Sequence, residues 1–538
     1  MSSSPRRRRG STAAPSLAAG VLLALSLPPW GWWPLGLAGA GLLYWRLAGL
    51  RARARLWSGW VAGLGCYAPG LWWARTFNWY GAVVLIALEA LFFAAAALLT
   101  PPYRGRAPAF VAAGTLAEAI RMTWPFGGLP LGGVFLGQAD GPLLQLARIG
   151  GPLLLTAGVW AGGVGLASLV SGIRHRERGP VPARRGAAIL VALALCVLVA
   201  TLSPDGGSPV RSITVALVQG GGRRDVDKAQ VSPAAVFAAQ VAATGVLDAV
   251  TPPPTLVLWP EDVVALAGPL RGSSQSRQMS QMARRLHTTL AAGFTEPASA
   301  TTFRNEIVVW APDGRIVGTF EKVHRVPFGE YVPYRSLIAH VADLSGVPLD
   351  AVPGRGTGLL RTPAGPLGIL VSFEVFYADR SHTSVREGAE LLVVPTNTSS
   401  YTTAQVPTQE VAADAVQAVE TGRDLVQSAP TGYSSVVDHR GQVRQRSVLG
   451  RRQVLTATVA LRRGLTPYDH WGDLPVLLLA AAALLAGWWR QRVTRSSPNG
   501  CRRRGCRRPR TWRDWRDRPR RPVADRIRGP EGPRPPPS

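Results

Sequence analysis

Hydrophobic residues are distributed unevenly along the 538-residue chain. The first 200 residues are almost continuously apolar, and a lone apolar block recurs near the end of the chain. A helix that spans a bilayer needs about 20 predominantly apolar residues. Eight stretches approach this length, and each predicts a membrane-spanning helix. They are 14–30, 33–50, 56–74, 80–100, 107–124, 150–172, 186–202 and 473–489.

Between the seventh and eighth stretches the pattern becomes that of a layered α/β domain. A Pro/Gly/Ser linker at 203–211 is followed by short apolar runs, which predict strands, and by longer segments that predict helices. Asp313-Gly314 between two such runs predicts a β-hairpin. Strands that alternate with helices indicate mainly buried sheets. The expected strands are 213–219, 256–259, 288–294, 306–310, 316–322, 367–373, 391–395, 425–429 and 434–438, and the expected helices are 234–250, 275–286 and 403–421.

The arginines predict how the chain is oriented in the membrane. They gather before the first apolar stretch, after the second, fourth and sixth stretches, and in the tail after the eighth. Cytoplasmic loops carry the excess of Lys and Arg in membrane proteins. Both termini are therefore expected in the cytoplasm, and the domain after the seventh stretch outside it. Residues 205–470 hold 25 basic and 23 acidic residues, so the other 26 units of the formal net charge of +28 lie in termini and loops.

Composition also weighs against other classes of protein. The arginine-rich tail could bind nucleic acid, but a solvated tail near anionic lipid headgroups is favoured. Residues 6–27 resemble a signal peptide, yet no small-residue cleavage site follows them, so an uncleaved first helix is expected. None of the four cysteines lies within 212–470, which predicts no disulfide and no thiolate metal site there. No metal or other cofactor is expected.

Two features of the apolar region carry charge or break helices. Glu89 and Glu118 lie in or near apolar stretches, where a carboxylate is costly. Arg121 follows Glu118 by one helical turn, which predicts a satisfied ion pair. The connection 124–132 is apolar but rich in Pro and Gly, and predicts a re-entrant or interfacial loop at the outer surface.

Four residues of the 212–470 domain are candidates for chemistry. Glu261 follows the apolar run Leu-Val-Leu-Trp-Pro, although it could instead cap a following helix. Lys322 ends an expected strand and is one of two lysines against 58 arginines, which suggests a role that only an amine performs. Glu330 lies in a loop bounded by Gly and Pro that could hold a carboxylate rigidly. Ser372, in the expected strand 367–373, is the candidate nucleophile.

A carboxylate, an amine and a nucleophile at strand ends are the groups that acyl transfer requires. The carboxylate takes the proton of the nucleophile, and the ammonium stabilises the developing oxyanion.

The motifs around these residues resemble those of a known family. Leu-Trp-Pro-Glu261, Glu-Lys322-Val-His-Arg-Val-Pro-Phe-Gly-Glu330-Tyr-Val-Pro and Ser372-Phe-Glu374 occur in the order of the Glu, Lys and Cys motifs of the nitrilase superfamily. With seven apolar stretches before them and one after, the chain resembles apolipoprotein N-acyltransferases over roughly residues 13–490.

The resemblance implies an integral membrane α-helical bundle of about eight spans plus an extracytoplasmic α/β nitrilase-like sandwich domain (αββα). The expected parts are listed in chain order: a cytoplasmic N-terminus (1–12), a seven-span membrane domain (13–202), a linker (203–211), the nitrilase-like domain (212–470), an eighth span (473–490) and a disordered cytoplasmic Arg/Pro-rich tail (491–538).

The implied reaction takes place at the bacterial cell membrane. An acyl chain moves from the sn-1 position of a phospholipid to the N-terminal amine of a diacylglyceryl-cysteine lipoprotein, through an acyl-enzyme. Phospholipid, lipoprotein and membrane lipids are the expected partners, and nucleic acid is not. By resemblance Glu261 is the base, Lys322 the oxyanion partner and Glu330 an orienting carboxylate. Glu374, Phe373 and Tyr331 are supporting residues.

The nucleophile departs from the family pattern, because Ser372 stands where the family has a cysteine. A thiol with a pKa of about 8.5 is a few per cent ionised at neutral pH, whereas a hydroxyl is essentially never so. Three alternatives follow. Ser372 is a slower nucleophile that forms an oxygen ester; the protein is an inactive paralogue that binds phospholipid or lipoprotein; or it is a membrane scaffold for a partner enzyme.

Overall fold

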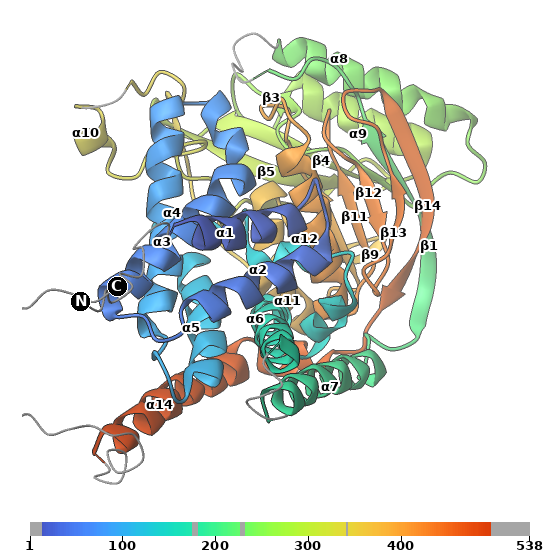
Figure 1. Ribbon diagram of the computed structural model, residues 1–538. Coiled ribbons are helices and arrows are strands. Elements are labelled where there is room, and N and C mark those ends of the chain that lie inside the picture. Colours follow the sequence, from blue (N-terminus) through green and yellow to red (C-terminus); the bar gives the residue numbers. More distant parts are fainter. Residues whose placement is uncertain (1–12, 175–180, 226–231, 341–342, 497–538) are drawn as a thin grey trace, which may run out of the picture. The chain divides into compact units, whose positions relative to one another are not determined.

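The computed structural model describes residues 13–174, 181–225, 232–340 and 343–496 (Figure 1). The expected N-terminal segment 1–12 and residues 497–538 of the expected tail lie outside the described residues.

All eight apolar stretches form helices. These are α1 (Ala14–Ser26), α2 (Trp33–Arg46), α3 (Ala52–Gly70), α4 (Trp79–Leu99), α5 (Arg106–Arg121), α6 (Ala147–Arg174), α7 (Val181–Leu202) and α14 (Leu474–Ser496). Short 3-10 turns, η1 (Trp72–Thr76), η2 (Val134–Gln138) and η3 (Pro142–Leu146), lie in their connections. Four described segments are long and apolar enough to cross a membrane: 79–99, 142–174, 181–202 and 474–493. A count of eight spans stays a prediction.

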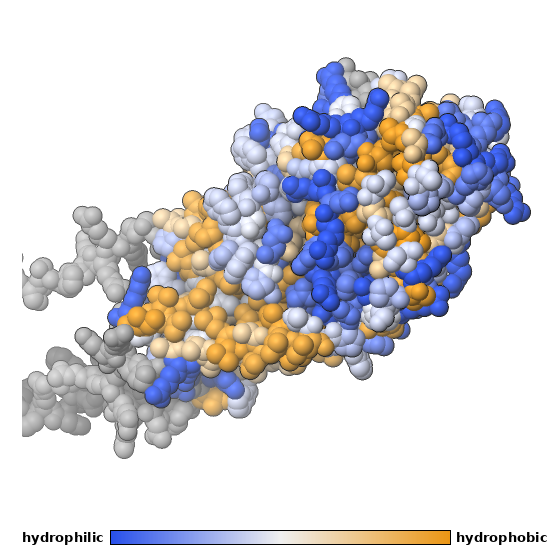
Figure 2. All heavy atoms as spheres, turned by 90° about the vertical axis from the view of Figure 1, so that its right-hand side faces the viewer, coloured by the Kyte–Doolittle hydropathy of each residue, from blue (hydrophilic) through white to orange (hydrophobic). Residues whose placement is uncertain are grey.

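The long apolar helices expose hydrophobic side chains. On α7, Val191, Leu195 and Leu198 are more than half exposed, and Leu478 and Leu485 of α14 are exposed in the same way. Figure 2 shows a band of hydrophobic residues along the lower side of the view, where α7 lies in Figure 1. Such surface is costly in water and is expected of helices that face lipid.

Arg121 organises the polar interior of the helical region. Its side chain is fully buried and pairs with Glu118 at 2.7 Å and with Glu89 at 3.2 Å. The predicted Glu118–Arg121 pair is therefore confirmed, and Glu89 is an additional partner. The same guanidinium donates to the backbone carbonyls of 129–131, and so fixes the helix-breaking connection 124–132 at the end of α5.

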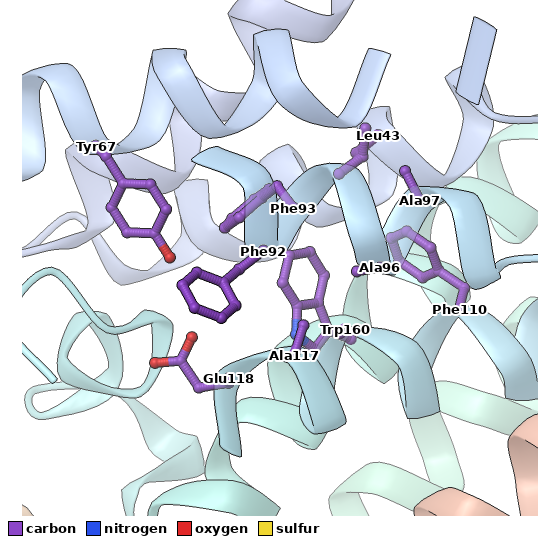
Figure 3. Close-up of a pocket in the computed structure, with 11 residues that line it drawn as sticks. Leu43, Tyr67, Phe92, Phe93, Ala96, Ala97, Phe110, Ala117, Glu118 and Trp160 are labelled. Carbon is purple, nitrogen blue, oxygen red and sulfur yellow. The ribbon is translucent and has the colours of Figure 1, made fainter. Parts of the chain in front are cut away.

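A small cavity adjoins this ion pair (Figure 3). Its lining is mainly apolar and includes the aromatic rings of Tyr67, Phe93, Phe110 and Trp160, with the Glu118 carboxylate on one side. Since Glu118 is already neutralised by Arg121, this cavity is explained by the packing of large rings between helices. It contains none of the candidate catalytic residues.

Two sheets form the second half of the chain. The first has the strand order β14-β1-β2-β4-β5-β6, with β3 paired to β4 and β7 paired to β5; the second has the order β13-β12-β11-β10-β9-β8. The strands of the first are β1 (Pro209–Gln219), β2 (Leu256–Leu258), β3 (Val264–Ala265), β4 (Thr289–Pro297), β5 (Thr302–Trp310), β6 (Ile316–Glu321), β7 (Asp350–Ala351) and β14 (Gln453–Arg462). Those of the second are β8 (Leu359–Thr362), β9 (Gly365–Ile369), β10 (Leu391–Pro395), β11 (Leu425–Ser428), β12 (Ser435–Val437) and β13 (Val443–Arg446).

Alternating side chains on the strands create the layers of an αββα sandwich. On β1, Val215 and Leu217 join a core between the two sheets, together with Ile369 and Val393 of the second sheet. Their neighbours on β1 point to the opposite face and pack with helices α8 (Pro233–Thr244) and α9 (Ser274–Leu286). This is the period of two expected of a strand buried on both faces. The remaining helices are η6 (Gly245–Ala249), α10 (Arg335–Ile338), η7 (Ser372–Phe376), α11 (Ala378–Arg386), α12 (Gln405–Thr421) and α13 (Pro467–Trp471).

Helix α12 joins the sandwich to the helical region. Its residues are buried along its whole length, in one apolar cluster with the outer face of the second sheet and the apolar helices. Gln405 donates to the carbonyl oxygens of Pro69 and Gly70 at 2.6 and 3.0 Å. Gln409 accepts from the backbone N–H of Gly132 at 2.9 Å. These bonds give hydrogen-bond partners to backbone carbonyl groups at the end of α3 and to a backbone N–H group in the connection 124–132.

Two local predictions are wrong. The expected strand 367–373 ends at Ile369, and Ser372 instead begins the 3-10 turn η7. The alternative that Glu261 caps a helix also fails, because residues 261–262 form a turn before β3. The predicted hairpin at Asp313-Gly314 is confirmed by the antiparallel pairing of β5 with β6.

The Arg121 cluster predicts a large effect of one substitution. Arg121→Met leaves two buried carboxylates without their cation and the carbonyls of 129–131 without their donor, which should destabilise the protein by about 3 kcal/mol or more. Thermal unfolding of the detergent-solubilised protein measures this. Arg53→Met, which removes an exposed arginine from α3, is the matched control and should change little. Equal effects of the two substitutions would contradict a central role for the Arg121 pairings.

Candidate active site

The candidate residues follow the ends of strands from both sheets. Glu261 comes after β2, Lys322 directly after β6, and Ser372 shortly after β9. All three are buried, with exposed fractions of 4% for Glu261, 2% for Lys322 and 7% for Ser372. Polar groups buried this deeply need partners, and their partners define the site.

Lys322 lies between two carboxylates. Its Nζ is 2.8 Å from Glu261 Oε1 and 2.9 Å from Glu330 Oε1. Asn305 of β5 completes the group, because its Nδ2 donates to the same two oxygens at 2.8 and 3.0 Å. The other oxygen of Glu330 accepts from the backbone N–H of Val326 at 2.7 Å, which holds the loop that carries it. The predicted meeting of Glu261, Lys322 and Glu330 is therefore observed.

Burial and pairing set the charges of this group. Burial alone would lower the pKa of Lys322, but the carboxylates of Glu261 and Glu330 outweigh it and raise that pKa above its usual value. Lys322 is therefore an ammonium. Burial raises the pKa of Glu261, against the opposing effect of Lys322 and with a further rise from Glu330. A carboxylate with a raised pKa is a stronger base than an exposed one.

Ser372 has an unusual backbone conformation. Its φ is +50°, in the left-handed region that costs a non-glycine residue free energy. The turn places the Ser372 side chain at the start of η7, directly beyond the end of β9. Strain of this kind persists only where the surroundings hold it.

Glu374 supplies that support. Its Oε2 accepts from the N–H of Val371 at 2.7 Å, and its Oε1 accepts from the N–H groups of Val323 and His324 at 2.8 and 3.0 Å. One fully buried carboxylate thus ties the turn that carries Ser372 to the segment directly after Lys322. The predicted supporting role of Glu374 in the reaction stays a prediction.

The hydrogen bond of Ser372 leads away from Glu261. Thr396, the residue after β10, has its Oγ1 3.0 Å from Ser372 Oγ and 2.7 Å from Glu410 Oε1. Because β9 and β10 are parallel neighbours, the residues after their carboxyl ends meet at one edge of the sheet. Glu410 reaches the same place from the second turn of α12.

The two other predicted supporting residues lie beside the site. Phe373 packs against Phe376 and Tyr377, within the apolar cluster that joins the sandwich to the helical region. Tyr331 donates its hydroxyl to the carbonyl of Phe126 at 3.2 Å, in the connection 124–132. Both residues therefore connect the site to the apolar helices.

Asn305, Thr396 and Glu410 were not predicted from the sequence. Asn305 and Glu410 are polar residues on segments that are otherwise buried, which is the one signal that could have indicated them. Thr396 directly follows an apolar strand, as do the residues that were predicted. Among the described residues, no group of three or more His, Cys, Asp or Glu side chains is arranged to hold a metal ion.

Comparison with known sequences matches both halves of the chain. The apolipoprotein N-acyltransferase N-terminal domain matches residues 19–165, and the carbon-nitrogen hydrolase domain matches residues 214–464. The apolipoprotein N-acyltransferase of Geobacter metallireducens is 30% identical over 87% of this chain and 93% of its own length. That of Mycolicibacterium smegmatis is 31% identical over 87% of this chain and 84% of its own length.

Solved structures similar to the sandwich include a nitrilase-superfamily protein from Saccharomyces cerevisiae. It is 21% identical, covers 48% of this chain and 93% of its own, and gives a TM-score of 0.36. An amidase from Nesterenkonia sp. is 18% identical, covers 50% of this chain and 98% of its own, and gives a TM-score of 0.36.

The sequence relatives extend over both the helical region and the sandwich, at about 30% identity in two distant bacteria. The chain therefore belongs to the apolipoprotein N-acyltransferases, which are acyltransferases of the carbon-nitrogen hydrolase superfamily.

Proposed function

We propose that this protein transfers an acyl chain from a phospholipid to the N-terminal amine of a diacylglyceryl-cysteine lipoprotein, with Ser372 as the nucleophile. The observation that carries the proposal is the buried ammonium of Lys322 between Glu261 and Glu330, in the domain whose strained turn presents Ser372. Base, oxyanion partner and nucleophile are the three functions that acyl transfer needs.

In the first half of the reaction, Ser372 Oγ attacks the carbonyl carbon of the phospholipid ester. A bond forms between Oγ and carbon, the carbonyl oxygen becomes an oxyanion beside the Lys322 ammonium, and the serine proton passes to a buried carboxylate. Glu261 is the base that the motif implies. The ester bond to glycerol then breaks, and the departing lysophospholipid oxygen takes up that proton. Ser372 is left as an oxygen ester.

In the second half, the α-amine of the lipoprotein attacks the oxygen ester. The amine gives a proton to a buried carboxylate, the amide bond forms, and that proton passes to the Ser372 oxygen as it leaves. Since Lys322 stays protonated through both halves, it stabilises each oxyanion without exchanging protons. Glu330 and Asn305 keep the ammonium in place.

The site is close to apolar surface that could receive a lipid chain. The loop that carries Glu330 meets the connection 124–132, where the ring of Phe126 packs against Phe328 and Tyr334. These three side chains are exposed, although they are large and hydrophobic. We infer that this aromatic cluster faces the outer leaflet, with the sandwich extracytoplasmic and eight helices spanning the cell membrane.

The transfer reaction tests the proposal with a phospholipid whose sn-1 chain is fluorescent and a synthetic diacylglyceryl lipopeptide. The full-length protein should move the label to the peptide, and Ser372→Ala should abolish the transfer. Ser372→Cys should be faster, because the thiol ionises more readily, at a packing cost of about 1 kcal/mol. If neither the native chain nor Ser372→Cys transfers label while folded, the inactive or scaffold alternative is correct.

Lys322→Arg should reduce acyl transfer by about 100-fold or more, although the charge is retained. The planar guanidinium cannot take the place of a compact ammonium that fits between two carboxylate oxygens at 2.8 and 2.9 Å. The reverse exchange at an exposed site, Arg315→Lys, is the control and should leave the rate unchanged. If Lys322→Arg transfers acyl chains at the native rate, Lys322 has only a structural role.

The orientation is tested with reporter fusions in cells. A reporter joined after residue 205 should give an extracytoplasmic signal, and one joined after residue 495 a cytoplasmic signal, because arginine-rich loops follow only the even-numbered apolar stretches. An extracytoplasmic signal from the second fusion would contradict the eight-span arrangement.

A further inference from the structure

Ser372 has a hydrogen-bond pathway that the motif does not explain. The hydroxyl of Thr396 lies between Ser372 Oγ, at 3.0 Å, and Glu410 Oε1, at 2.7 Å. Glu410 is 2% exposed, and its Oε2 is buried without a hydrogen-bond partner among the described residues. A buried carboxylate that makes so few contacts is costly, which suggests that its proton affinity has a use.

Glu261 is less suited to take the proton of a serine. Its Oε1 accepts from both Lys322 and Asn305, and these contacts oppose the rise in pKa that burial gives Glu261. Within the described residues, the side chain of Glu410 accepts a hydrogen bond from the neutral hydroxyl of Thr396 and from no cation. A hydroxyl nucleophile needs a stronger base than a thiol does.

We propose that Glu410 and Thr396 form a proton relay for Ser372, which lets a serine act in a site whose motif implies a cysteine. This inference rests on the proposed function. As Ser372 Oγ bonds to the ester carbon, its proton moves to Thr396 Oγ1, and the Thr396 proton moves to Glu410 Oε1. As the ester bond breaks, a proton returns from Glu410 through Thr396 to the departing lysophospholipid oxygen. In the second half of the reaction the attacking amine gives a proton through Thr396 to Glu410, and that proton returns by the same path to Ser372 as it leaves. Thr396 contacts the reacting oxygen, and Glu410 is a positioning residue that acts through it.

A hydroxyl has one proton to donate, so the state of Glu410 decides the direction of the relay. In the structure Thr396 Oγ1 is placed to donate to either Ser372 Oγ or Glu410 Oε1. When Glu410 is ionised it can only accept, so Thr396 gives its proton to Glu410 and can then take up the proton of Ser372. When Glu410 is protonated it donates to Thr396, which then donates to Ser372. The first arrangement activates the nucleophile, and the second supplies the proton that the departing serine needs.

The surroundings of Glu410 suit this exchange. Burial raises its pKa to about 8, opposed by the bond from Thr396 and aided by the nearby Asp414. The charged or titratable groups that face it are Asp414 one turn along α12, Glu261 after β2, Lys322 after β6 and Tyr401 before α12. The ionised, activating form therefore becomes more populated as the pH rises through about 8.

The test measures how fast the full-length protein forms an acyl-enzyme with the fluorescent phospholipid alone. Glu410→Gln and Thr396→Val, which keep the shape of the side chains, should slow this step by about 100-fold, and Thr396→Ser should stay within about threefold of the native rate. The native rate should rise with pH through about 8, and this rise should vanish in Glu410→Gln. Glu420→Gln, farther along the same helix and equally buried, is the matched control and should react normally.

A comparison of serine with cysteine at position 372 distinguishes a proton relay from a structural role of Glu410 and Thr396. In a Ser372→Cys background, Glu410→Gln should change acylation by less than about threefold, because a thiol can use Glu261. Equal losses in the serine and cysteine proteins, or no loss in either, would overturn the relay and leave the proposed function intact. An acyl-enzyme that forms only in Ser372→Cys also overturns the relay. No acyl-enzyme in either protein, with thermal unfolding unchanged, overturns the proposed function as well.

Discussion

The arrangement of the site depends on one buried cation. An ammonium with 2% exposure is tolerated only because two carboxylates lie within 3 Å of it. Glu261, Lys322 and Glu330 come from three separate segments of the chain, so their pairing fixes the ends of β2 and β6 and the loop 326–334 relative to one another. Loss of the Lys322 charge would leave two carboxylates in the interior without their cation. In the proposed reaction, the same constraint keeps a fixed positive charge where the oxyanion develops.

A second constraint holds the turn of Ser372, the proposed nucleophile, to the segment after Lys322. The carboxylate of Glu374 bonds to backbone on both sides of the site, and so holds the strained turn at Ser372 against the segment after Lys322. Helix α12 then packs on the same turn and on the apolar helices, which brings Glu410 to Thr396 beside Ser372. Helix α12 therefore both contributes a residue beside Ser372 and attaches the sandwich to the helical region.

Much of this could be predicted from the sequence, because strands that end in one polar residue are a local pattern. Glu261 and Lys322 were found in this way, and the apolar stretches gave all eight helices. The turn at Ser372 could not be predicted, since a positive φ at serine is imposed by the contacts of Glu374. Glu410 was missed for a related reason: it lies within a helix, and only the packing of α12 brings it to Ser372.

The central claim is that Ser372 carries the acyl group. The direct measurement is peptide mass spectrometry of the full-length protein after brief incubation with a phospholipid whose sn-1 chain is isotopically labelled, without acceptor. The account predicts a labelled acyl group on the peptide that contains Ser372. Its bond should survive neutral hydroxylamine, as an oxygen ester does, while the corresponding thioester in Ser372→Cys should be cleaved. Label on another residue, or no label on a protein that transfers acyl chains to lipopeptide, would contradict the account.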